Sequence, residues 1–92
     1  MPVSAEHVIR RGDVLWRATL DGVLVRVPGG DDVVKLAGTG AALWAELDEP
    51  IRFHAVCAAL ARTHDANAER IASDLAPVID ELADKAVVQI DR

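Results

Sequence analysis

The apolar side chains change their spacing once along this 92-residue chain, close to Gly38. Before Gly38 they recur with a period of two, as in Val14, Trp16 and Ala18, which is typical of a β-strand. After Gly38 they recur three and four residues apart, which is typical of amphipathic helices. The predicted fold class is therefore α+β, with a three-stranded antiparallel sheet followed by three helices.

Turn residues divide the first part of the chain into strands over residues 14–20, 23–27 and 33–36. Asp21-Gly22 predicts a two-residue type I′ hairpin turn, and residues 28–32, which hold one Pro and two Gly, predict a second turn. Three strands joined this way form a meander, so residues 33–36 should lie at an edge. Residues 1–12 are polar and are expected to form a loosely held arm ahead of a domain at 13–92.

The second part of the chain predicts helices over residues 40–47, 53–62 and 68–83, and a short final strand over 87–90. Thr39 is the expected N-cap of the first helix, and Asn67 or Asp65 that of the third. Arg52 is a poor cap, so the second helix should fray at its start. Pro77 predicts a kink or a break in the third helix.

Charge and composition exclude several classes of protein. The chain has 15 acidic and 10 basic side chains, a net charge of −5. Nucleic acid and anionic membrane are therefore unexpected partners, and a neutral or basic partner fits better. The single cysteine permits no internal disulfide, and we see no signal peptide or membrane span, so a cytoplasmic location is expected.

The sequence offers no catalytic or metal site that outweighs a simpler interpretation. His54, Cys57 and His64 are the soft ligand candidates, fewer than the four that structural zinc usually takes. Cys57 falls on the apolar stripe of its helix, where a thiol does not ionise easily. Gly38 and Gly40 flank Thr39 but match no phosphate-binding motif. We therefore predict no catalytic residue, no metal and no cofactor.

Two features remain open on pattern alone. The edge strand at residues 33–36 is either blunted by Lys35 or used to add a peptide strand. The acidic residues of the third helix form either a solvated face or an acidic wall beside a groove that attracts a partly basic peptide. These residues are Asp74, Asp80, Glu81 and Asp84.

Three segments of the chain resemble the PqqD family. They are VVKLAGTGAALW at 33–44, PIRFHAVCAAL at 50–60, and residues 65–88. The resemblance implies a winged-helix-like domain that is not an enzyme. Such a domain binds the leader of a ribosomally made precursor peptide and presents it to a modifying enzyme, a radical enzyme in coenzyme PQQ synthesis or a leader protease in lasso-peptide pathways.

The resemblance also implies where the leader would lie, antiparallel on the third strand in a groove bounded by the third helix. The residues carried over are Val33, Val34, Lys35, Leu36, Ile71, Asp74, Leu75 and Val78. Two alternatives stay open at this point. One is a winged-helix DNA-binding module, and the other is a homodimer joined through edge strands without a peptide ligand.

Overall fold

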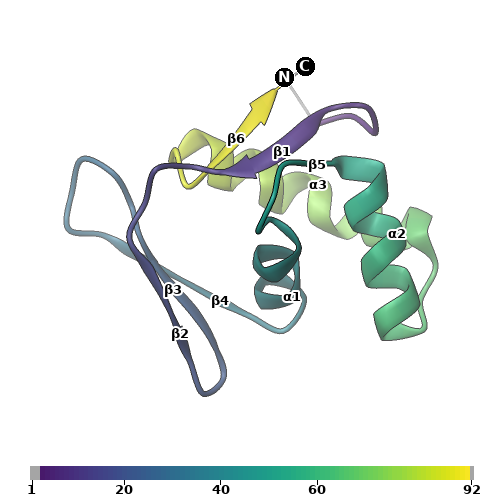
Figure 1. The fold of residues 1–92 in the computed structure, drawn as a ribbon, viewed down its shortest axis with the longest axis horizontal. Coiled ribbons are helices and arrows are strands. Elements are labelled where there is room, and N and C mark those ends of the chain that lie inside the picture. The colour runs from purple at the N-terminus through teal and green to yellow at the C-terminus, as the bar shows by residue number, and fades with distance from the viewer. Residues whose placement is uncertain (1–2, 92) are drawn as a thin grey trace.

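The computed structural model describes residues 3–91, which form three helices and two small antiparallel sheets (Figure 1). One sheet has the order β2-β3-β4 and the other the order β5-β1-β6. The strands are β1 (Val8–Arg11), β2 (Trp16–Thr19), β3 (Gly22–Arg26), β4 (Val33–Ala37), β5 (Ile51–Arg52) and β6 (Val88–Asp91). The helices are α1 (Thr39–Glu46), α2 (Phe53–His64) and α3 (Ala68–Asp84).

The predicted meander is confirmed, and so is the α+β class. β3 pairs antiparallel with β2 and with β4, which leaves β4 at an edge. The expectation of a single sheet is wrong, because β1, β5 and β6 form a second one. β1 and β5 have only four and two residues, too few for a period to be recognised.

The expectation of a loose arm at residues 1–12 is also wrong for the described part of it, residues 3–12. β1 is the central strand of its sheet, and Ile9 is completely buried. Val3 is buried as well, and its amide donates to Oδ1 of Asp80 at 3.0 Å. The segment belongs to the folded domain because it supplies apolar side chains to the core.

The same segment supplies hydrogen-bond acceptors to the first turn of α2. Arg52 provides no side-chain cap, as the sequence predicts. The amides of Phe53 and His54 instead donate to the carbonyl oxygens of His7 and Ala5, at 2.8 and 3.1 Å. These bonds take up first-turn donors that have no partner inside the helix, which opposes the predicted fraying.

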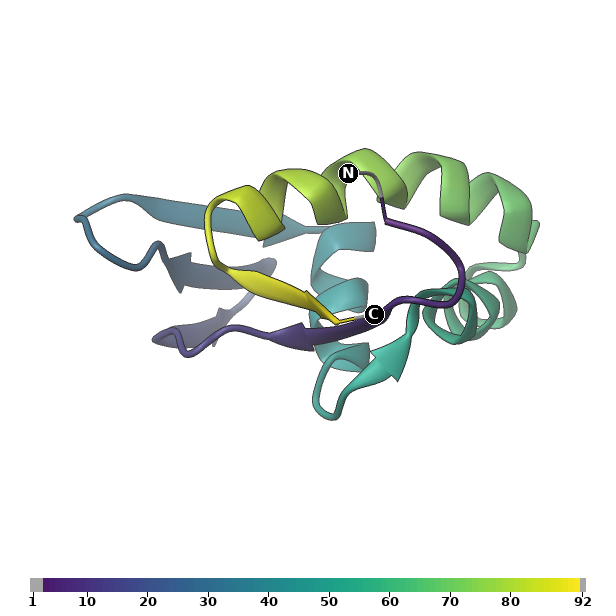
Figure 2. The ribbon, with the colours of Figure 1, turned by 90° about the horizontal axis from the view of Figure 1, so that it is seen from above.

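The other helix ends agree only partly with the predictions. Asn67 caps α3, since its Oδ1 accepts from the amides of Glu69 and Arg70. Thr39 is not a cap but the first residue of α1, after Gly38 at φ 57°. α3 continues through Pro77 without a break (Figure 2). Pro77 is exposed, so a backbone carbonyl that loses its partner there can bond to water.

The β2–β3 turn differs from the predicted type I′ form. Thr19 pairs with Gly22, so Leu20 and Asp21 form its tip, and neither Asp21 nor Gly22 has a positive φ. Gly22 is required for another reason. A Cβ atom there would lie 2.1 Å from the carbonyl oxygen of Leu36 on β4.

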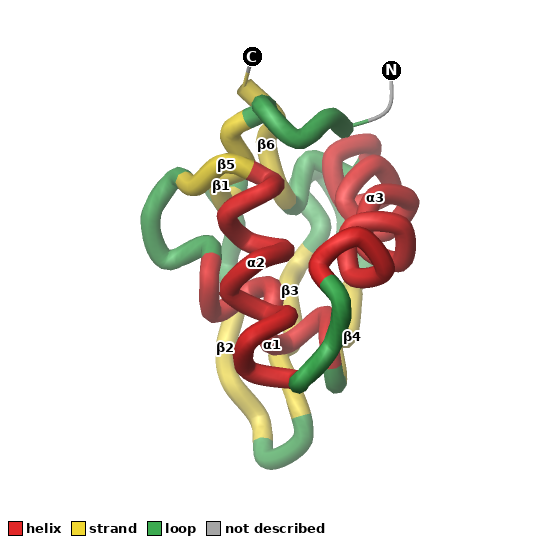
Figure 3. Tube along the Cα trace, turned by 90° about the vertical axis from the view of Figure 1, so that its right-hand side faces the viewer, coloured by secondary structure: helices red, strands yellow, loops and turns green. Residues whose placement is uncertain are grey.

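The core lies between the helices and the two sheets. α2 packs against both α1 and α3, while α1 packs against β4 (Figure 3). The largest side chains that are completely buried in the core are those of Trp44, Ile9, Leu43, Leu47, Leu60 and Ile79. Among the described residues, no helix is long and apolar enough to cross a membrane.

The burial of Ile9 gives a first prediction. Ile9→Ala should lower the free energy of unfolding by about 2–5 kcal/mol, because it leaves a cavity in the core. Urea denaturation measures this, with Leu20→Ala as the control, since Leu20 is fully exposed at a turn. If the Ile9→Ala protein were as stable as the control, β1 would contribute little to the free energy of unfolding.

Candidate functional site at the edge of β4

The edge of β4 is the part of the fold that is open to another chain. Within residues 3–91, β4 pairs with β3 alone, over five residues from Val33 to Ala37. An unpaired strand edge presents a row of amide and carbonyl groups that another strand can bind.

The ladder determines which backbone groups face outward. The amide of Val27 donates to the carbonyl of Asp32, and the β3–β4 register continues from there without interruption. Antiparallel pairs alternate, so Val34 and Leu36 bond to β3. Val33, Lys35 and Ala37 therefore direct their amide and carbonyl groups to the free edge. Ala37 is a residue that the sequence interpretation missed, although strand alternation could have indicated it.

The side chains of β4 alternate in the same way. Leu36 is buried and Val34 half-buried, both against the core. Val33, in contrast, is 57% exposed, and Lys35 is exposed on the outer face of the sheet.

Lys35 does not guard the free edge. Its Nζ lies 2.9 Å from Oδ2 of Asp21 in the turn that leads into β3, so it is paired toward the β3 side of β4. The hydrogen bond and the positive charge of Lys35 lower the pKa of the Asp21 carboxyl. The ammonium is thus drawn away from the edge, which favours an open edge over a blunted one.

On α3, the predicted site residues separate into buried and accessible ones. Ile71 and Leu75 belong to the core, and Leu75 is only 2% exposed. Val78 is half-buried at the margin of the core, and Asp74 is exposed. A substitution at Leu75 would therefore disturb folding, whereas Val78 can be changed to test binding.

The acidic residues of α3 do not form one wall. Asp80 accepts from the amide of Val3, so it faces the N-terminal segment. Asp74, Val78 and Glu81 are spaced four and three residues apart, so they share a different flank of the helix. Figure 2 shows α3 and β4 on the same side of the molecule, opposite β1.

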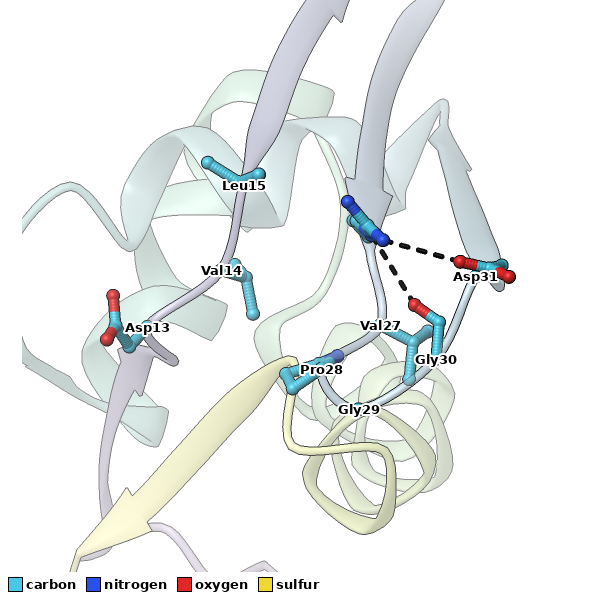
Figure 4. Close-up of a pocket in the computed structure, with 9 residues that line it drawn as sticks. Asp13, Val14, Leu15, Val27, Pro28, Gly29, Gly30 and Asp31 are labelled. Atoms are coloured by element: carbon cyan, nitrogen blue, oxygen red, sulfur yellow. Dashed lines mark hydrogen bonds and ion pairs between the residues drawn. The ribbon is translucent and has the colours of Figure 1, made fainter.

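The cavity of about 580 Å³ at the turn between β3 and β4 is not part of this edge (Figure 4). It is lined by Asp13, Val14, Leu15, Arg26, Val27, Pro28, Gly29, Gly30 and Asp31. Arg26 spans it with bonds of 3.4 Å to the carbonyl of Gly30 and the carboxylate of Asp31. The cavity therefore lies between residues 13–15 and the β3–β4 turn, and no residue of β4 lines it.

The residues considered for metal or thiol chemistry do not come together. Cys57 is buried and free, and burial raises the pKa of its thiol, which disfavours the reactive thiolate. His54 is exposed, and Nδ1 of His64 lies 2.9 Å from the carbonyl oxygen of Leu60. Residues 3–91 hold no group of three potential metal ligands.

Comparison with known proteins identifies the family of the chain. The sequence model of the family described as Coenzyme PQQ synthesis protein D (PqqD) matches residues 22–88. The chain belongs to the PqqD family. This family comprises recognition elements for ribosomally synthesised and post-translationally modified peptides, which are generally binding domains without catalytic activity.

A solved structure shares the fold. It is the solution NMR structure of the PqqD truncation of Methylobacterium extorquens PqqCD, described as a functional, stand-alone recognition element. The two structures have a TM-score of 0.78 and 22% sequence identity, over 95% of this chain and 94% of that one. No curated protein sequence matches the chain.

The buried thiol gives a second prediction. Because the pKa of Cys57 is raised in the folded state, the unfolded chain ionises first as the pH rises above 9.0. The free energy of unfolding should therefore fall with increasing pH in that range, and less steeply in a Cys57→Ala protein. Urea denaturation of both proteins between pH 8 and pH 10 measures this, and parallel curves would contradict it.

Proposed function

We propose that the chain binds the leader of a ribosomally made precursor peptide as an added antiparallel strand on β4. The observation that carries this proposal is the free edge, where Val33, Lys35 and Ala37 present unpaired backbone groups. The peptide then extends the β2-β3-β4 sheet by one strand, as in other cases of strand addition. Membership of the PqqD family favours peptide binding at this edge over the alternative that the edge is exposed but binds nothing.

Backbone pairing alone gives too little affinity. Each ladder bond contributes about 0.5–1.5 kcal/mol, and association costs about 4–15 kcal/mol. Apolar leader side chains must therefore be buried as well. The half-buried side chains of Val34 and Val78 are the available apolar contacts on the two elements that border the peptide.

Charge gives the leader an expected composition. Asp74 and Glu81 lie on the flank of α3 that carries Val78, and each has one basic neighbour on the same helix surface, at 4.0 and 3.4 Å. Both carboxylates are largely exposed, so they can attract a basic leader residue at the cost of these weak pairs. A leader that alternates apolar and basic residues fits best.

The bound leader is presented to a peptide-modifying enzyme. The family resemblance suggests a radical enzyme or a leader protease as examples of that enzyme. A precursor peptide encoded near the gene is the natural ligand with which to test the proposal.

A proline on the free edge tests the backbone contact. Lys35→Pro removes an outward amide but no β3–β4 bond, and proline is tolerated on edge strands. Leader affinity should fall about tenfold, the effect of losing about 1.4 kcal/mol of ladder bonding. Calorimetry measures the affinity, and Lys35→Ala controls for the lost side chain and its bond to Asp21.

The result is decisive if the proline protein keeps its native amide spectrum. Equal leader affinity in the proline and alanine proteins would overturn strand addition at β4. If light scattering showed that the free edge instead joins two copies of the chain, the homodimer alternative would be correct.

A charge on the margin of α3 tests the apolar contact. Val78→Asp should weaken leader binding at least tenfold, because it removes an apolar contact and puts in its place a carboxylate that an apolar leader side chain would have to desolvate. Ser73→Asp adds the same charge on the exposed side of the same helix and should have little effect. Similar affinities for the two variants would mean that this flank of α3 does not border the leader.

A further inference from the structure

Arg11 lies between the chain's two tryptophans. Its guanidinium carbon is 4.6 Å from the ring centroid of Trp16 and 4.9 Å from that of Trp44. The two indoles meet edge to face, with centroids 5.8 Å apart. The cluster joins the end of β1, the start of β2 and the last turn of α1, and it is held by cation–π and aromatic contacts.

The cluster has more hydrogen-bond donors than acceptors. Nη2 of Arg11 donates to the carbonyl oxygen of Trp44 at 2.7 Å. Nη1 lies 3.8 Å from Oδ1 of Asp48, whose side chain is largely exposed. Nε of Arg11 and Nε1 of Trp44 are buried and have no acceptor among residues 3–91. Trp44 is only 1% exposed, so its unpaired N–H group lies within the protein and costs free energy.

Both residues with unpaired donors line the same cavity. It has a volume of about 340 Å³, and its other walls include Trp16, Asp48 and the small side chains of Ala18 and Ala41. Trp16 is 44% exposed on an edge strand and packs on both Arg11 and Trp44. The two donor atoms are themselves buried, so a ligand in the cavity would have to displace this exposed ring to reach them.

We propose that this cavity binds the side-chain carboxylate of a docking protein, such as a glutamate. One oxygen would accept from Nε1 of Trp44 and the other from Nε of Arg11, while the apolar stem packs on the Trp16 ring. The site contains a single guanidinium, and the carboxylate of Asp48 competes for that group. A ligand with one negative charge therefore suits the site. A docking protein fits better than a free acid, because it also covers the exposed face of Trp16.

The site is independent of peptide binding at β4. β2 and β4 are opposite edges of one sheet, so both can be occupied together. Failure of one proposal therefore leaves the other standing.

The two tryptophans provide the measurement. The chain has no tyrosine and no further tryptophan, so tryptophan emission and the two indole N–H signals in NMR report on this cluster alone. The signals are assigned with Trp16→Phe. Sodium propionate, against sodium chloride at equal ionic strength, should shift the Trp44 indole proton downfield and saturate. A short blocked peptide with one glutamate should bind at least as well as propionate.

Three variants test the assignment. Asp48→Asn should tighten propionate binding about fivefold, the effect of one like charge about 4 Å away in water. Arg11→Gln should abolish binding, whereas Arg17→Gln, at an exposed position of β2, should leave it unchanged. Because Asp48 is exposed, Asp48→Asn should not disturb folding. It therefore tests the proposed carboxylate site even if Arg11→Gln fails to fold.

Two results would overturn the proposal. Without a saturable shift of the Trp44 indole signal beyond that in chloride, the donors are satisfied by water and the cavity is no carboxylate site. If propionate binds but the glutamate peptide does not, the site takes a free acid and not a docking protein.

Discussion

The pairing of β3 with β4 is the interaction on which the rest of this structure depends. Its register places Val23, Val25 and Leu36 in the core and turns the backbone of Val33, Lys35 and Ala37 to the free edge. The close approach at Gly22, where no Cβ fits, belongs to the same pairing. A shift of one residue would exchange the two faces of β4, so the core and the proposed leader site are specified together.

The N-terminal segment closes the other side of the domain. It pairs with β5 and β6, bonds to α3 through Asp80 and supplies acceptors to the first turn of α2. These contacts occupy one flank of α3 and leave the flank with Val78 for a ligand. The two proposed binding regions, the β4 edge and the cavity around Arg11, thus lie at opposite edges of one sheet.

Much of this could be predicted from the sequence. The alternation in residues 14–36 and the helical stripes after Gly38 gave the meander, its edge strand and the three helices. The family resemblance is confirmed by the match over residues 22–88. The accessibility of the proposed site residues was harder to predict, because a helical stripe identifies an apolar face without showing what covers it. Ile71 and Leu75 proved to be core residues, so Val78 is the one apolar site residue of α3 that remains partly accessible.

Local patterns in the sequence were enough to specify strands with a clear period, helices with an apolar stripe, and the Asn67 cap. The second sheet, the capping of α2 by the carbonyls of Ala5 and His7, and the contact of Arg11 with Trp44 depend on the tertiary structure. These contacts join residues that are tens of positions apart. Their energy comes from closing the core around them, which no local pattern records.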